Sequence, residues 1–280
     1  EVPTNEDATA EMRTLFGADV MSYPKPSGLL KYLVRSVVED QDIVLDFFAG
    51  SGTTLHGMWK QSLEDGLRRR CILIQLPEPI DPDDSSVSDA CTFCVNHGLQ
   101  PTIAEISKER LRRAITGIKL ARPDAQTRGT LLEETSEDVL VDLGFRVLKL
   151  DTSNIKAWDA EFEDVEGALL SSVENVKPDR SEADVLYELL LKFGLDLAVP
   201  IEQRNIAGKD VHIIGAGALI VCLADEIGLD VVEGIATLKH ELSPETIRVV
   251  FKDSGFADDV VKTNAVQILH QASIEDVKSL

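Results

Sequence analysis

The sequence is poor in cysteine and contains no long apolar run. Its four cysteines, in a chain of 280 residues, are too few for a disulfide scaffold and fit a reducing, cytoplasmic setting. No apolar stretch approaches the ~18–20 residues that a membrane span needs, and no basic segment followed by an apolar one marks a signal peptide. With 44% apolar residues, the sequence indicates a globular protein with a core and no membrane contact.

Basic residues are also scarce relative to acidic ones. The chain has 28 Lys and Arg against 49 Asp and Glu, a formal net charge of −21. Binding to a nucleic-acid backbone draws on many Lys and Arg contacts, so this balance argues against a broad nucleic-acid-binding face. Because the chain opens at Glu1 rather than at a methionine, we expect a piece of a longer protein. If that protein binds DNA, most of the binding surface should lie outside these residues.

Alternating strand and helix patterns predict an α/β protein. Residues 43–47 and 68–76 are apolar and β-branched, as strands are, and a helix is expected between them at 53–63. Such a strand–helix–strand unit makes the two strands parallel, and the second reads as buried on both faces. Further helices are expected at 29–40, 102–121, 179–196, 230–240 and 258–271, further strands at 145–150, 211–214, 219–223 and 247–251, and a loop at 77–101.

These elements fall into two parts. Residues 1–150 hold the strand–helix–strand unit, 151–180 are acidic and irregular like a linker, and 181–280 form a smaller α/β domain. In the second part, "GAGAL" (Gly215–Leu219) has strands on both sides and no helix after it, so it predicts a hairpin turn rather than a nucleotide loop.

The most informative stretch is "DIVLDFFAGSGTTLHG", from Asp42 to Gly57. Gly50 and Gly52 follow a strand and precede a helix, where the backbone can approach a ligand closely. The spacing is neither the dinucleotide fingerprint, because residue 55 is Leu, nor a phosphate loop, because no Gly-Lys-Ser/Thr closes it. Asp46 at the strand end favours a cationic or hydrogen-bond-donating ligand. A purely structural turn is the alternative reading.

The string "DFFAGSGTT" resembles the S-adenosylmethionine-binding motif of amino-methylating DNA methyltransferases, usually Asp-Pro-Phe-x-Gly-Ser-Gly-Thr-Thr, with Phe47 in place of the proline. About 20 residues upstream, "YPKP" resembles the Lys-Pro motif of the β-ordered group. The strings "LFGADVMSYPKPSGLLKYLV", "IAEISKERLRRA", "DLGFRVLKLDTSNIKAWD" and "VVFKDSGFADDVVKTNAVQIL" extend the resemblance over essentially the whole chain, to the C-terminal half of the modification subunit of type III restriction–modification systems.

The resemblance implies a fold, a cofactor and a set of site residues. The fold is a partial Rossmann-like methyltransferase sheet followed by the smaller α/β domain, and the cofactor is S-adenosylmethionine. Its methionine end would be held by Phe48, Ala49, Gly50, Ser51, Gly52 and Thr53, with Lys25 and Pro26 close by and Asp46 at the strand end. The family places an acid for the ribose at the end of the second strand. Gln75 occupies that place here and Glu78 is the nearest carboxylate, so the ribose ligand stays open, with Glu78 favoured.

The family's catalytic segment is missing. Adenine-N6 methylation uses an Asp/Asn-Pro-Pro-Tyr segment that holds a flipped base, and none occurs in these 280 residues. We therefore expect no catalytic residue here, no activity of the isolated chain, and a sheet that lacks strands. The family further implies double-stranded DNA bound through an N-terminal part, a homodimer of modification subunits, and a helicase–nuclease restriction subunit as partner. The alternative is a non-catalytic dimerisation or restriction-subunit-binding module with a vestigial pocket.

Three other features have plainer readings. Cys91 and Cys94 have no second ligand pair in sight, so no metal site is expected and "CTFCVNH" reads as a loop. Arg68–Arg70 and Arg110–Arg113 read as solvated faces paired with acids rather than as contacts to DNA phosphates. His56 has no obvious partner.

Overall fold

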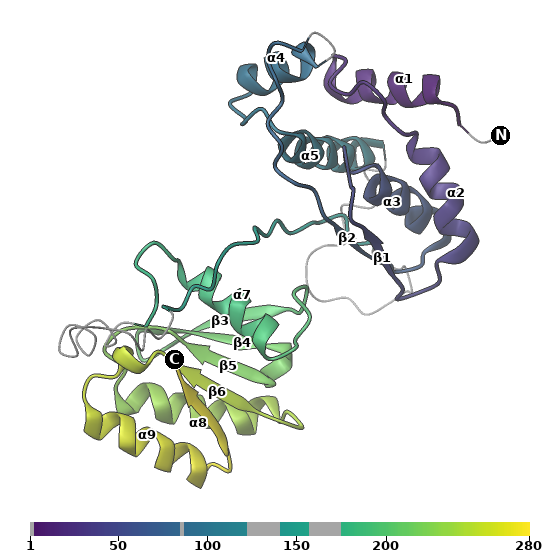
Figure 1. Ribbon diagram of the computed structural model, residues 1–280. Helices are drawn as coiled ribbons and strands as arrows, with labels where there is room; N and C mark the ends of the chain where they lie inside the picture. The colour runs from purple at the N-terminus through teal and green to yellow at the C-terminus, as the bar shows by residue number, and fades with distance from the viewer. Residues whose placement is uncertain (1–2, 85–86, 122–140, 157–174) are drawn as a thin grey trace. The chain divides into compact units, whose positions relative to one another are not determined.

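A computed structural model describes residues 3–84, 87–121, 141–156 and 175–280 of the chain (Figure 1). The chain divides into two compact units, Glu1–Phe145 and Arg146–Leu280. Most of the segment expected to be a linker, 151–180, lies outside the described residues. Among the described helices, none is long and apolar enough to cross a membrane.

The first unit is built around a two-stranded parallel sheet. Its elements, in chain order, are α1 (Asn5–Phe16), α2 (Ser27–Val37), β1 (Ile43–Asp46), α3 (Thr53–Asp65), β2 (Arg70–Leu73), α4 (Ser88–Asn96) and α5 (Ile103–Ala121). In the register of the two strands Ile43 pairs with Arg70 and Asp46 with Leu73. The predicted parallel strand–helix–strand unit is confirmed.

Helices cover one face of this sheet. Val44 and Leu73, which point to that face, pack with Trp59 of α3 and Leu111 of α5 in one apolar cluster, to which α2 adds Val34. A second cluster joins α1, α4 and α5, where Phe16 and Phe93 meet edge to face with their ring centroids 5.1 Å apart.

Side chains on the other face of the sheet are exposed. Leu45 and Ile72 pair across the two strands, and they are 55% and 49% exposed. Phe47 and Ile74 continue this face beyond the strand ends at 61% and 49%. The prediction that the second strand is buried on both faces is therefore wrong, because the described residues place helices against one face only.

Two further expectations, for the segments 77–101 and 145–150, are wrong. The segment 77–101 contains α4 as well as loop, because Phe93 and Cys94 form an apolar face buried against α1 and α5. Residues 145–150 form neither strand nor helix. In addition, α1 was not predicted, although Thr4 and Asp7 form a reciprocal capping box at its start.

The second unit is a three-layer α/β/α structure. Its elements are α7 (Glu182–Lys192), β3 (Ile201–Ile206), β4 (Lys209–Ile214), β5 (Leu219–Cys222), α8 (Leu229–Leu242), β6 (Arg248–Phe251), α9 (Asp259–Gln271) and β7 (Asp276–Ser279). The strands lie in the order β3-β4-β5-β6-β7, antiparallel up to β5 and parallel from β5 to β7. Helix α7 covers one face, and α8 and α9 cover the other (Figure 1).

The alternation of side chains along the central strands explains the layers. Ile213 and Ile220 pack toward α8 and α9, whereas Ile214 and Leu219 pack toward α7. The two strands are joined by a short 3₁₀ turn at Gly215–Gly217, so the hairpin prediction for "GAGAL" is confirmed. The edge strands β3 and β7 were not predicted, since their sequences are largely polar.

Candidate functional site

The glycine turn links β1 to α3 and is fixed first by Asp46, the last residue of β1. One oxygen of Asp46 accepts a hydrogen bond from the Phe48 N–H (3.1 Å) and the other from the Thr54 hydroxyl (2.5 Å). The carboxylate therefore ties the start of the turn to the first turn of α3. Gly50 and Gly52 have φ of 52° and 76°, a left-handed conformation that glycine adopts without strain.

The end of β2 holds the turn from a second side. The Ala49 N–H donates to the Ile74 carbonyl (3.1 Å), and the Gly50 N–H donates to Oε1 of Gln75 (2.8 Å). Gln75, expected as a possible ribose ligand, thus supports the turn itself. Glu78, the other candidate, has an exposed side chain further along the chain.

Helix α5 closes the third side. A Cβ on Gly52 would lie 3.0 Å from Oγ of Ser107 and 3.3 Å from Cγ of Leu111, so this glycine allows the turn and the helix to pack closely. Nη1 of Arg110, from the same helix, donates to the hydroxyls of Ser51 (2.6 Å) and Thr53 (2.5 Å). Arg110 is completely buried, so the reading of this arginine as part of a solvated face is wrong.

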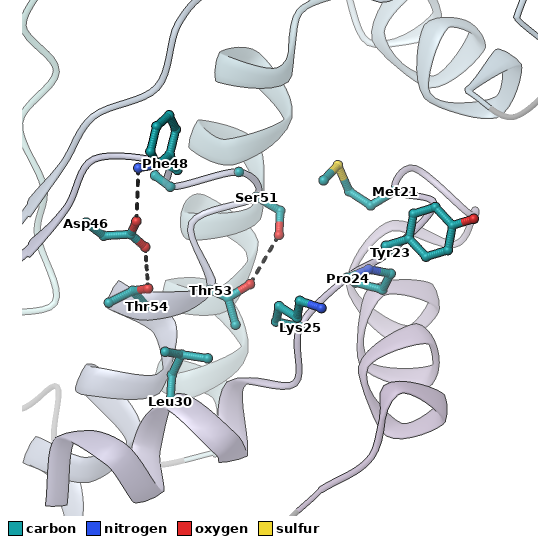
Figure 2. A pocket seen from close by; sticks show the side chains of 12 residues that line it. Met21, Tyr23, Pro24, Lys25, Leu30, Asp46, Phe48, Ser51, Thr53 and Thr54 are labelled. Carbon is teal, nitrogen blue, oxygen red and sulfur yellow. Dashed lines mark hydrogen bonds between the residues drawn. The ribbon is translucent and has the colours of Figure 1, made fainter.

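A cavity of about 250 Å³ lies between the glycine turn and the segment before α2 (Figure 2). Figure 2 shows the turn on one side of it and Tyr23, Pro24 and Lys25 on the other. The cavity is lined by Met21, Tyr23, Pro24, Lys25, Leu30, Asp46, Phe48, Ala49, Gly50, Ser51, Thr53 and Thr54. Residues from two separate segments, 21–30 and 46–54, therefore form one pocket.

Most of the predicted site residues line this pocket. They are Lys25, Asp46, Phe48, Ala49, Gly50, Ser51 and Thr53. Four others lie outside the lining: Pro26 caps α2, Gly52 packs on α5, Gln75 supports the turn, and Glu78 is exposed. The prediction missed Met21, Tyr23, Pro24, Leu30 and Thr54, of which Tyr23, Pro24 and Thr54 lie inside the quoted motifs.

The pocket has charges of both signs and an aromatic rim. Lys25 provides an ammonium group, and Ser51 and Thr53 provide hydroxyls, whereas Asp46 provides a carboxylate. The residues Tyr23 and Phe48 are 87% and 83% exposed. This set suits a zwitterionic ligand with an apolar or aromatic part. Cys91 and Cys94 lie on α4, outside the lining, and among the described residues no group of three His, Cys, Asp or Glu is placed to hold a metal ion.

A known protein family matches part of the first unit. The sequence pattern of a DNA methylase family, N6_N4_Mtase, matches residues 5–74, which run from α1 to the end of β2. That range includes every residue that lines the pocket and Ile74, which accepts the Ala49 N–H, and it ends one residue before Gln75.

Three curated relatives extend the likeness. The chain is 35% identical over 158 residues to the Mod subunit of the type III restriction-modification enzyme StyLTI from Salmonella typhimurium, covering 56% of this chain and 21% of that protein. It is 30% identical over 205 residues to the EcoPI Mod subunit of Escherichia phage P1, covering 73% and 28%. It is 36% identical over 75 residues to the type II methyltransferase M.KpnI of Klebsiella pneumoniae, covering 27% and 18%.

The chain therefore spans 21% and 28% of the length of the two Mod subunits. It carries a segment of the DNA methylase family, and several of its homologues are named as Mod subunits of type III restriction-modification enzymes.

Proposed function

We propose that this chain is the S-adenosylmethionine-binding and C-terminal part of a site-specific DNA methyltransferase that modifies adenine at N6, the modification subunit of a type III restriction–modification system. The observation that carries the proposal is the pocket in which the Lys-Pro segment and the glycine turn face each other. Both motifs resemble the cofactor-binding motifs of the family. One precedes α2 in the sequence and the other follows β1, yet both line the same pocket.

The charges of the pocket fit this cofactor. Lys25 and the hydroxyls of Ser51 and Thr53 would face its carboxylate, and Asp46 would face its positive charges, since a carboxylate oxygen has lone pairs left after one hydrogen bond. When bound, the cofactor supplies the electrophilic methyl group of the reaction. Gln75 already accepts the Gly50 N–H, so we assign the ribose hydroxyls to Glu78.

We further propose that the isolated chain transfers no methyl group. It contains no Asp-Pro-Pro-Tyr segment to hold a flipped adenine. DNA contact, dimerisation of modification subunits and recruitment of a restriction subunit are proposed for the longer protein, and residues 181–280 are the proposed interaction domain.

Calorimetric titration of the 280-residue chain with S-adenosylmethionine tests the pocket. We expect saturable binding that is lost in Gly50→Val, because the branched side chain strains a left-handed position and fills the pocket. Gly17→Val is the matched control: Gly17 also has positive φ (73°) with open space around its Cβ position, but it caps α1 away from the pocket. It should bind normally.

Two outcomes would contradict the proposal. A well-folded chain that binds no cofactor would favour the alternative, an interaction module with a vestigial pocket. Transfer of a radiolabelled methyl group to duplex DNA by the pure chain would show that the missing segment is not needed.

A further inference from the structure

Arg110 lies beneath the glycine turn and links it to the rest of the unit. Its side chain is completely buried, and a buried guanidinium needs both an opposite charge and hydrogen-bond acceptors. Glu11 of α1 supplies the charge, at 3.0 Å from Nη2, and Ser51 and Thr53 supply acceptors for Nη1. One side chain thus joins α1, α5 and the turn.

The chemistry of these groups fixes the direction of the hydroxyl protons. A guanidinium has donors only, so Ser51 and Thr53 must accept from Arg110 and their own protons must point elsewhere. The two hydroxyl oxygens are 3.2 Å apart, so one hydroxyl donates to the other. The remaining proton is left for the pocket, which both residues line. The contacts with Arg110 therefore favour a hydroxyl donor that faces the pocket.

Glu11 extends the same network to the opposite wall of the pocket. It accepts hydrogen bonds from the backbone N–H of Ser27 (3.1 Å), from the Ser27 hydroxyl and from Nζ of Lys60 (2.6 Å). Ser27 begins α2 directly after Lys25 and Pro26. Burial raises the pKa of Glu11, but the hydrogen bonds from Lys60 and Ser27 outweigh it and lower the pKa to about 2, so the carboxylate is ionised at neutral pH. The Lys-Pro segment and the glycine turn are therefore held by one ion pair, between the buried Arg110 and the partly buried Glu11.

We propose that Arg110, paired with Glu11, is a positioning residue that sets the distance between the two pocket walls and the orientation of the Ser51 and Thr53 hydroxyls, and thereby the affinity for the cofactor. This inference rests on the proposed function of the pocket. It differs from a merely structural ion pair, which would stabilise the fold without changing the affinity of the folded protein.

The variant that tests the proposal is Arg110→Met combined with Glu11→Gln, which leaves no buried charge unpaired. The matched control is Arg69→Met. The Arg69 side chain is 1% exposed and pairs with Asp65 at 2.7 Å in the same unit, but it touches the far end of α3. We expect the double variant to bind S-adenosylmethionine at least about tenfold more weakly, as loss of a charged hydrogen bond implies, and Arg69→Met to bind like the parent chain even if it unfolds more easily.

Two further measurements complete the test: whether the effects of substitutions on affinity add up, and how fast the backbone of the two segments exchanges hydrogen. The pair of substitutions Ser51→Ala and Thr53→Val should weaken binding similarly. Adding this pair to the Arg110→Met/Glu11→Gln variant should cause little further loss of affinity, because both sets of substitutions disrupt the same hydrogen-bond network. Hydrogen exchange without ligand should rise at residues 23–28 and 47–56 in the double variant but not in Arg69→Met. Additive losses, or unchanged affinity and exchange, would overturn the positioning role. If the parent chain binds no cofactor, the proposed function fails, but opening confined to these two segments would still show that Arg110 and Glu11 hold the two pocket walls together.

Discussion

Three polar side chains beneath the glycine turn, the buried His56 and Arg110 and the partly buried Glu11, differ in charge because their partners differ. Glu11 accepts hydrogen bonds from Lys60, Ser27 and Arg110, so it stays ionised. Burial lowers the pKa of Arg110, with Glu11 acting against it, and an arginine remains charged at neutral pH. At mildly acidic pH, His56 is the one of the three whose protonation differs between the folded and the unfolded protein.

His56 predicts a pH dependence of stability. Burial and then the charge of Lys60 lower its pKa to about 3, although Glu11 lies 3.7 Å away and acts in the opposite direction. The folded imidazole is therefore neutral, while the unfolded one takes a proton below its ordinary pKa of 6.5. Stability from this group is complete above that pH and is lost as the pH falls toward 3, by up to about 1.4 kcal/mol per pH unit. Glu11 contributes its own loss at lower pH, between its ordinary 4.5 and about 2.

Urea unfolding between about pH 7 and pH 5 measures this effect. In a Trp158→Phe background the remaining tryptophan, Trp59, is buried 3 residues from His56 and reports on this unit. We expect the free energy of unfolding to decrease as the pH is lowered from about 7 to about 5 in the parent, and to decrease much less in His56→Gln. An equal slope in both proteins would assign the dependence to other groups.

Among the elements, α2 and α3 are packed unusually closely, and this contact sets the two walls of the pocket. A Cβ on Gly57 would lie 2.7 Å from Cβ of Leu30, 2.7 Å from the Ser27 carbonyl and 2.9 Å from the Lys31 nitrogen. Since backbone atoms are among these neighbours, the helices must separate to accept any side chain at this position.

Gly57→Ala should therefore destabilise the unit by about 1–3 kcal/mol, as overpacking does, and should weaken cofactor binding as well. Gly117 of α5 provides the control, because it is exposed, helical and has nothing within 4 Å of its Cβ position. Gly117→Ala should raise stability by up to about 1 kcal/mol without changing affinity. Urea unfolding and calorimetric titration of both variants measure the two effects, and an unperturbed Gly57→Ala would show that the helix contact is loose.

The elements that could be predicted are those with local signals. Strands β1 and β2 and helix α3 followed from a short apolar run, a glycine turn and a helical pattern, and the hairpin at Gly215–Gly217 followed from small residues between strands. Helix α4 could not be predicted because serine and proline precede it and its few apolar residues gain their burial from α1 and α5. The edge strands of the second unit have polar sequences that become strands through pairing.

The site divides in the same way. The motifs located the pocket lining, but they gave no hint that Arg110 and Glu11, 99 residues apart, would form its support. A basic residue in an amphipathic helix reads as solvated unless the fold brings an acid to it. Gln75 likewise occupies the expected position of a ligand, and its contact with Gly50 depends on strand register.

At the scale of the whole molecule, the exposed face of the β1–β2 sheet is the feature most relevant to association with other polypeptide. Leu45, Phe47, Ile72 and Ile74 lie on adjacent positions of two strands and are about half exposed or more. A continuous apolar patch of this kind on a sheet attracts further polypeptide or another copy.

The isolated chain should therefore self-associate through this patch. We expect the sedimentation coefficient to rise with concentration in the parent and to stay at the monomer value in Leu45→Thr/Ile72→Thr, since threonine keeps the strand propensity while reducing the apolar surface. Val260→Thr is the control, because Val260 is 67% exposed but lies on α9; it should associate like the parent. Association that persists in the double variant would assign it to another surface. Since the patch points away from α2, α3 and α5, cofactor binding should be equal in all three proteins, so a change in affinity would instead reveal that the sheet face and the pocket are coupled.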